Sequence, residues 1–218
     1  MSNANPLHPS LFKPDAIPPE VKAFNEAFLA RMANMPSPGE RQDDGAETPS
    51  PFGAKAKSAR ASVRKVEANG VEVEVRIVPP ASGNPHGAYL HLHGGGLVFG
   101  SADQDDAMLE RIADATGLAS VSVEYRLAPA NPYPAAWDDS EAAAVWLAKN
   151  VKAEFGNDAL AIGGESAGAT LAVPTLVRLR DKHGFTGFNA ANLSYGNYDT
   201  SMTPSQTAAA SLSSHAAG

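Results

Sequence analysis

One serine in the sequence lies in a setting that suits nucleophilic catalysis. The stretch Gly164-Glu165-Ser166-Ala167-Gly168 has the pattern GxSxG and lies between a predicted strand, Ala159–Gly164, and a predicted helix, Ala167–Asp181. A serine at such a junction takes a strained backbone conformation that lifts its Oγ above the sheet, and small flanking residues let strand and helix pass closely. The Ala167 N–H would approach the same point from a helix N-terminus, where it can stabilise negative charge. Ser166 is therefore the candidate nucleophile.

A second motif, His93-Gly94-Gly95-Gly96, comes at the end of another predicted strand, Ala88–His93. Consecutive glycines let backbone N–H groups face a ligand with no side chains in the way, which is how an oxyanion hole is built. A plain glycine-rich turn and a phosphate-binding loop are the alternatives, but the pattern GxxxxGK[ST] is absent. The two motifs in this order favour acyl transfer.

The elements that must position these motifs follow from hydrophobic spacing and turn residues. Apolar spacing predicts a helix at about 20–34, and Asn69-Gly70 between Val63–Ala68 and Val71–Val78 predicts an antiparallel hairpin. The remaining predicted elements are a helix at about 103–115, a strand at Ala119–Tyr125, a helix at 135–154 and a strand at Phe188–Tyr195. Strands that alternate with helices predict an α/β fold whose mainly parallel sheet carries helices on both faces and sites at the carboxyl ends of its strands.

The composition excludes several classes of protein. The 218 residues are 43% hydrophobic and contain no cysteine, so a disulfide framework, thiol catalysis and cysteine-ligated zinc are excluded. The net charge of −7 argues against non-specific nucleic-acid binding, which requires neutralisation of phosphates. No run of eighteen apolar residues and no secretory signal is present, so we expect a cytoplasmic protein without a membrane partner.

Together the motifs resemble the hormone-sensitive-lipase-like family of α/β-hydrolases, whose members are mostly carboxylesterases. The stretches that carry this resemblance are HGGGLVFGS (93–101), VSVEYRLAP (121–129), YPAAWDD (133–139), GGESAG (163–168) and YGNYDTSMTPS (195–205). The resemblance implies an α/β-hydrolase fold with Ser166 as nucleophile. It also implies oxyanion-hole amides from Gly95, Gly96 and Ala167, with Gly94 shaping the loop.

The same resemblance implies hydrolysis of small carboxylic esters through an acyl-serine intermediate, a role in lipid metabolism, and no metal or organic cofactor. His93 would position the glycine loop rather than act as the base, and the helix at about 20–34 would belong to a cap over the acyl pocket. Glu165 differs from the Asp or Thr that bacterial members usually carry at this position.

Other polar residues have simpler structural interpretations. His91 is expected to be a hydrogen-bonded core histidine. The residues Glu124, Arg126, Asp138 and Asp139 are expected to form structural ion pairs near the strand ends. The basic residues Lys55, Lys57, Arg60, Arg64 and Lys65 are expected to form a solvated face.

A serine hydrolase of this class also needs an acidic residue and then a histidine after the nucleophile. Asp199 and His215 have this order, but no predicted strand lies between them, and His183 lies at a helix end that suits a cation. The tail 206–218 is small-residue, low-complexity sequence. We therefore expect a fold that is incomplete at its C-terminus, a base that is absent and low activity.

These interpretations divide the chain into a cap helix and connection (1–60), a hydrolase core (61–205) and a tail (206–218). An early end would leave the strand Phe188–Tyr195 as an exposed sheet edge, so we expect homo-oligomerisation or aggregation through it. Two alternatives to an active esterase remain open. One is a catalytically dead relative that binds a small molecule, and the other is a non-functional fragment.

Overall fold

The computed structural model describes residues 17–34 and 56–199. Helix α1, Pro19–Ala33, forms a unit of its own. Within it the rings of Phe24 and Phe28, one helical turn apart, stack at 6.2 Å between centroids. The predicted helix at 20–34 is therefore present, while its role as a cap stays a prediction.

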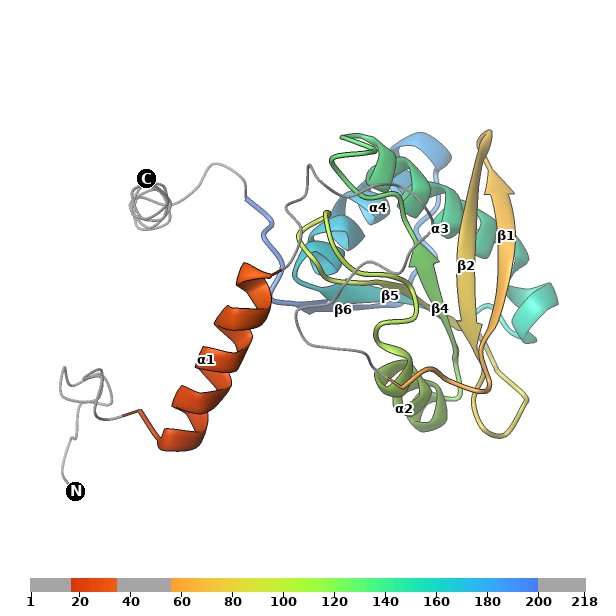
Figure 1. Ribbon diagram of the computed structural model, residues 1–218. Helices are drawn as coiled ribbons and strands as arrows, with labels where there is room; N and C mark the ends of the chain where they lie inside the picture. Colours follow the sequence, from red (N-terminus) through yellow and green to blue (C-terminus); the bar gives the residue numbers. More distant parts are fainter. Residues whose placement is uncertain (1–16, 35–55, 200–218) are drawn as a thin grey trace, which may run out of the picture. The chain divides into compact units, whose positions relative to one another are not determined.

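The second unit is built on a six-stranded sheet with the strand order β1-β2-β4-β3-β5-β6 (Figure 1). Its strands are β1 (Ser62–Ala68), β2 (Val71–Val78), β3 (Ala88–Leu92), β4 (Ala119–Glu124), β5 (Leu160–Glu165) and β6 (Ala190–Ser194). Strands β1, β2 and β4 pair antiparallel, whereas β4, β3, β5 and β6 pair parallel. This is the mainly parallel sheet with an antiparallel N-terminal hairpin that the sequence predicts.

The hairpin of β1 and β2 turns at Asn69 and Gly70, whose φ angles are 55° and 74°. Both angles are positive, as a type I′ turn requires, and asparagine and glycine tolerate this conformation best. The short turn sets the register in which Val66 lies opposite Val73, and both side chains enter the core.

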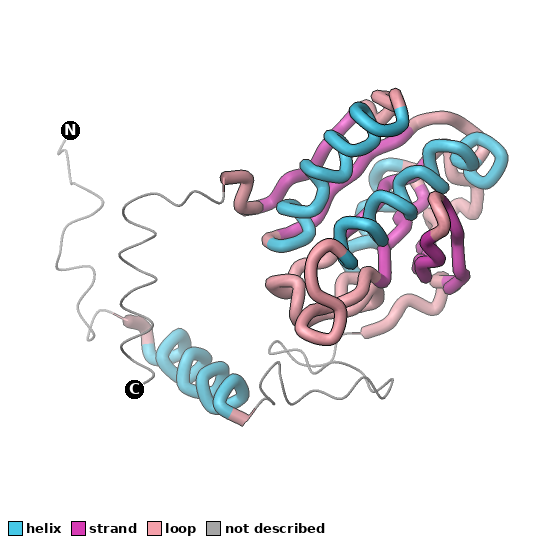
Figure 2. Tube along the Cα trace, turned by 90° about the horizontal axis from the view of Figure 1, so that it is seen from above, coloured by secondary structure: helices cyan, strands magenta, loops and turns pink. Residues whose placement is uncertain are grey.

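Three helices cover the two faces of this sheet (Figure 1). Helices α3 (Ala135–Phe155) and α4 (Ala167–His183) pack together over β1 to β6 on one face, and Figure 2 shows them side by side. Helix α2 (Asp106–Thr116) packs against β2 and β4 on the other face. The core between the layers is aliphatic, with Leu90, Val121, Ile162 and Leu171 fully buried. None of the helices in the described ranges is long and apolar enough to cross a membrane.

Tertiary contacts account for one boundary that differs from its prediction. The helix predicted at 103–115 begins instead at Asp106. The residues before it turn, because Ser101 Oγ donates to Asp103 and the Ala102 N–H donates to the Glu124 carboxylate at the end of β4. The hydrophobic periodicity that predicts the helix carries no information about a hydrogen bond between residues 22 positions apart.

Strand β6 is the last strand in the sheet order, and its residues Ala190 to Leu193 are exposed. It is shorter than the predicted strand Phe188–Tyr195, because only five residues pair with β5. Association through this edge remains a prediction.

The ion pair between the exposed Arg126 and the buried Asp139 provides a stability prediction. The Asp139 side chain is 1% exposed and accepts hydrogen bonds from Arg126 N at 2.8 Å and Nη2 at 2.7 Å. Replacing Arg126 by alanine leaves a buried carboxylate with one backbone donor, so we expect urea unfolding to show a loss of about 2 kcal/mol. The matched control is Lys65→Ala, which breaks the exposed pair with Glu72 and should cost less than about 0.5 kcal/mol. Equal losses would contradict the prediction.

Candidate active site

The candidate nucleophile lies on a sharp turn between β5 and α4. Strand β5 ends at Glu165, helix α4 begins at Ala167, and Ser166 between them has φ 51° and ψ −115°. This conformation is unfavourable for a residue with a Cβ and is typical of a nucleophile elbow. The Ser166 N–H is held by the Ser194 carbonyl at 2.9 Å, and the residue is exposed at the end of the sheet. The strained geometry expected of Ser166 is therefore present.

The flanking glycines are required by close packing. A Cβ on Gly164 would lie 2.0 Å from the Leu92 carbonyl oxygen, and one on Gly168 would lie 1.8 Å from the same atom. Both distances are far below van der Waals contact. The GxSxG pattern thus reflects the close passage of β5 and α4 against the end of β3.

The glycine loop begins beside this elbow because β3 and β5 are parallel neighbours, with Leu92 opposite Gly164. A Cβ on Gly94 would lie 3.7 Å from the Ser166 Cβ. Gly95 and Gly96 follow with φ 130° and 63°, angles that favour glycine, and neither N–H donates a hydrogen bond to another described residue. The fold thus brings together the two motifs, which are about 70 residues apart in the sequence.

His93 lies beneath the loop and is fully buried. Its Nδ1 is 2.8 Å from the Gly94 carbonyl oxygen, so Nδ1 carries the hydrogen and donates it. Its ring stacks on Tyr125 at 4.1 Å, and the Tyr125 hydroxyl donates to the His93 carbonyl at 2.7 Å. Burial lowers the pKa of His93 to about 4, which keeps the ring neutral. This geometry suits a residue that supports the loop.

The part played by Tyr125 is not evident from sequence reasoning, although the residue belongs to the VSVEYRLAP stretch. Its side chain is 1% exposed and spans from β4 to the end of β3. A tyrosine directly after a buried strand is the only local signal, because its partner His93 is 32 residues away.

His91 differs from its expected role. The ring is fully buried in β3, as predicted, but neither ring nitrogen makes a hydrogen bond to a described residue. The expectation of a hydrogen-bonded core histidine was therefore wrong. The place of His91 in a central strand determines that its ring is buried. Its hydrogen-bond partners, however, would have to come from other elements of the fold.

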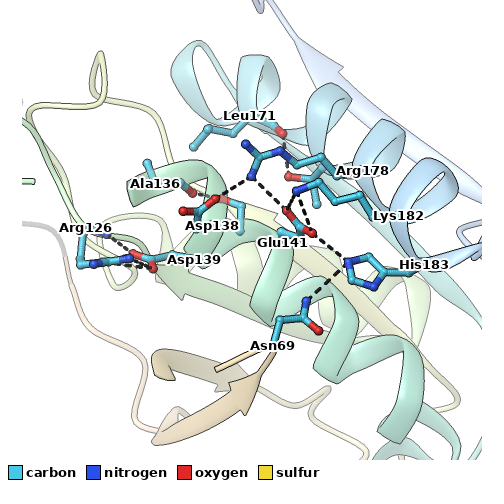
Figure 3. Close-up of polar contacts among 12 residues, drawn as sticks. Asn69, Arg126, Ala136, Asp138, Asp139, Glu141, Leu171, Arg178, Lys182 and His183 are labelled. Carbon is cyan, nitrogen blue, oxygen red and sulfur yellow. Dashed lines mark hydrogen bonds and ion pairs between the residues drawn. The ribbon is translucent and has the colours of Figure 1, made fainter. Parts of the chain in front are cut away.

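The acidic and basic residues near the strand ends form separate pairs rather than one set. Asp139 binds Arg126, and Asp138 instead binds Arg178 of α4 at 2.8 Å (Figure 3). Glu141, from the next turn of α3, binds Arg178, Lys182 and His183 (Figure 3). His183 is thus held in a structural cluster of α3 and α4, consistent with its place at a helix end.

The basic residues near β1 are also paired within the protein. Lys57 binds Asp103, Arg60 binds Glu110 and Asp114, Arg64 binds Glu154, and Lys65 binds Glu72. Lys55 lies outside the described residues. Intramolecular partners take up these charges, so the cluster is more than a solvated face.

Glu124 provides a prediction on pH dependence. Burial raises the pKa of Glu124 to about 7, although the Ala102 N–H donates to its carboxylate at 2.7 Å. Between about pH 4.5 and 7 the unfolded chain releases this proton while the folded protein retains it, so stability falls as the pH rises, by up to about 3 kcal/mol. Glu124→Gln removes the charge and keeps an acceptor for Ala102. Urea unfolding should show equal stability at pH 4.5 and a more stable variant at pH 8.

The control for this experiment is Glu67→Gln, which removes one negative charge at an exposed position of β1. An advantage of Glu124→Gln that is the same at every pH would contradict the prediction.

A base for Ser166 is not evident in the described part of the chain. Within residues 17–34 and 56–199 the Ser166 hydroxyl makes no hydrogen bond to a histidine. Asp199 is exposed after β6, whereas His215 and the tail 206–218 lie outside the described residues. The described residues thus contain the elbow and the glycine loop but no complete triad.

Sequence comparison finds known proteins that this chain resembles. A family model of the alpha/beta hydrolase fold matches residues 89–217. Esterase LipI of Mycobacterium tuberculosis is 43% identical over 98 residues, which are 44% of this chain and 30% of LipI. An arylesterase of Saccharolobus solfataricus is 34% identical over 119 residues, or 54% of this chain and 39% of the arylesterase.

Solved structures agree with this result. A hyperthermophilic esterase from the archaeon Pyrobaculum calidifontis superimposes with a TM-score of 0.59 at 30% identity, covering 81% of this chain and 50% of that one. An alpha/beta hydrolase from the metagenome of Lake Arreo gives 0.68 at 27% identity, covering 88% and 64%. The chain therefore matches less than two thirds of the length of each of these proteins.

Proposed function

Because this chain belongs to the alpha/beta hydrolase fold family, we propose that it supplies the nucleophile and oxyanion-binding part of a serine carboxylesterase acting on small esters. The relatives that it matches include an esterase and an arylesterase, and the glycine loop and the GxSxG stretch also resemble the hormone-sensitive-lipase-like branch. The observation that carries the proposal is the strained Ser166 beside the glycine loop. A small ester is the proposed substrate.

The proposed mechanism assigns a role to each part of the site. Ser166 Oγ attacks the ester carbonyl carbon, and the N–H groups of Gly95, Gly96 and Ala167 donate to the oxyanion that forms. The tetrahedral intermediate then releases the alkoxide, which takes up the proton lost by the Ser166 hydroxyl and departs as the alcohol, leaving an acyl-serine. Water then releases the carboxylic acid and restores the hydroxyl. Gly94 and His93 hold the loop in place, and Glu165 precedes the nucleophile at the end of β5.

Hydrolysis of p-nitrophenyl butyrate by the full chain tests this function. A fluorophosphonate probe, in which Ser166 Oγ displaces fluoride from phosphorus, gives a second readout that does not require turnover. We expect a measurable hydrolysis rate and one adduct, located by peptide mass spectrometry on the peptide that contains Ser166. A chain with neither hydrolysis nor an adduct would overturn the proposal and leave the non-catalytic binding protein as the function to test.

A further inference from the structure

The fully buried ring of His91 points to a further role beside the nucleophile. Neither of its nitrogens is hydrogen-bonded to a described residue, which is unusual for a buried polar group and calls for an explanation. Two carboxylates from other elements lie near one of these nitrogens. Asp105 Oδ2, from the loop before α2, and Glu165 Oε2, from the end of β5, are each 3.7 Å from His91 Nε2.

The chemistry of these neighbours determines which nitrogen bears hydrogen. Ionised carboxylate oxygens only accept hydrogen bonds, so a lone pair on Nε2 would be repelled by both of them. An N–H at Nε2 would instead be attracted by both. The separations are about 0.7 Å longer than a good N–H···O bond, a gap that small side-chain shifts can close. The ring is therefore placed to share one hydrogen between two carboxylates.

We propose that His91 is a positioning residue whose Nε2–H, shared by Asp105 and Glu165, joins the nucleophile elbow to the glycine loop. The inference rests on the proposed function. On the elbow side, Glu165 directly precedes Ser166. On the loop side, Gln104 Nε2 donates to Asp105 Oδ2 at 3.0 Å and to the Gly94 carbonyl oxygen at 3.3 Å.

The Gly94 carbonyl is the point at which this chain of contacts bears on catalysis. It also accepts from His93 Nδ1 at 2.8 Å, so two donors hold it. The Gly94 C=O and the Gly95 N–H belong to one planar trans peptide and point in opposite directions. Holding the carbonyl therefore orients the Gly95 N–H, one of the proposed oxyanion donors. His91 acts on that amide through Asp105 and Gln104 and does not touch substrate.

A divalent cation is the competing explanation, because one atom each from His91, Asp105 and Glu165 could act as a ligand and these atoms lie within 4.8 Å of one another. A cation would require Nε2 without hydrogen. We favour the shared hydrogen because the Gln104 amide already donates to the Asp105 oxygen that faces the ring. The two explanations place opposite protonation states on the same atom, so one measurement separates them.

The decisive experiment is long-range ¹H–¹⁵N NMR of histidine rings in the ¹⁵N-labelled full chain at pH 7, with the His91 signals assigned by their loss in His91→Gln. We expect a protonated Nε2 whose signals do not move on titration with Zn²⁺. An unprotonated Nε2, or His91 signals that shift at stoichiometric Zn²⁺, would overturn the proposal. This readout is independent of hydrolysis, so it stands even if the proposed function fails.

A second measurement follows the rate of Ser166 capture by the fluorophosphonate probe. His91→Leu removes the donor and should slow capture about tenfold or more, whereas His91→Gln keeps an N–H donor and should stay within about threefold of wild type. The control is His86→Gln at an exposed position before β3. A slow Gln variant would contradict the donor role, as would a fast Leu variant. If wild type shows neither capture nor hydrolysis, the proposed function is contradicted and the NMR result alone decides the role of His91.

Discussion

Ser166→Ala is expected to abolish fluorophosphonate capture and to lower p-nitrophenyl butyrate hydrolysis to the rate measured without protein. The proposed reaction forms its covalent bond at Ser166 Oγ, and Ser166 lies in the strained turn beside the glycine loop. Loss of the hydroxyl therefore removes the reacting group and leaves the rest of the site in place. The measurements are intact-protein mass spectrometry after labelling and initial rates of ester hydrolysis.

The matched control is Ser82→Ala. Ser82 is an exposed serine in the turn between β2 and β3, at the edge of the sheet opposite the carboxyl ends of β3 and β5. It should label and hydrolyse like wild type. Equal hydrolysis by wild type and Ser166→Ala would show that any activity of the preparation has another source.

The backbone of Ser166 provides an internal check on this result. At φ 51° and ψ −115° a residue with a Cβ is strained, and glycine is not. Ser166→Gly should therefore raise the free energy of unfolding by about 1 kcal/mol while it abolishes capture. A variant that is inactive and less stable than wild type would contradict the description of the elbow as strained.

Gly168→Ala is expected to have the largest effect on stability. Gly168 lies in the first turn of α4, where alanine would normally stabilise a helix by about 1 kcal/mol. Here the new Cβ would lie 1.8 Å from the Leu92 carbonyl oxygen and 2.7 Å from that of His93. Both contacts are with backbone, so α4 must move away from β3. We expect a loss of about 3 kcal/mol or more in urea unfolding, together with loss of Ser166 capture.

Gly184→Ala separates this steric effect from a general cost of replacing glycine. Gly184 ends α4 with φ 63°, and a Cβ there would have no atom within 4 Å. Only the unfavourable backbone angle opposes alanine at this position, so we expect a loss of about 1–2 kcal/mol and normal capture. A larger loss at Gly184 than at Gly168 would contradict the proposed packing of α4 on β3.

The fold and the neighbourhood of the two motifs could be predicted from the sequence because both depend on local patterns. Asn69-Gly70 favours the type I′ turn that the structure shows, and strands alternating with helices lead to a parallel sheet. Once β3 and β5 are parallel neighbours, the residues that follow them must meet at one edge. The candidate nucleophile and the glycine loop were therefore found without coordinates.

The partners of the buried polar groups were decided by the tertiary structure alone. Asp138 and Asp139 are adjacent in the sequence, yet one binds Arg178 of α4 and the other Arg126 after β4, because neighbouring residues on a helix point in different directions. The contacts of His91 with Asp105 and Glu165, and of Glu124 with Ala102, likewise join separate elements. Hydrophobic periodicity records which positions are buried, while hydrogen-bond partners depend on distances between elements that only packing determines.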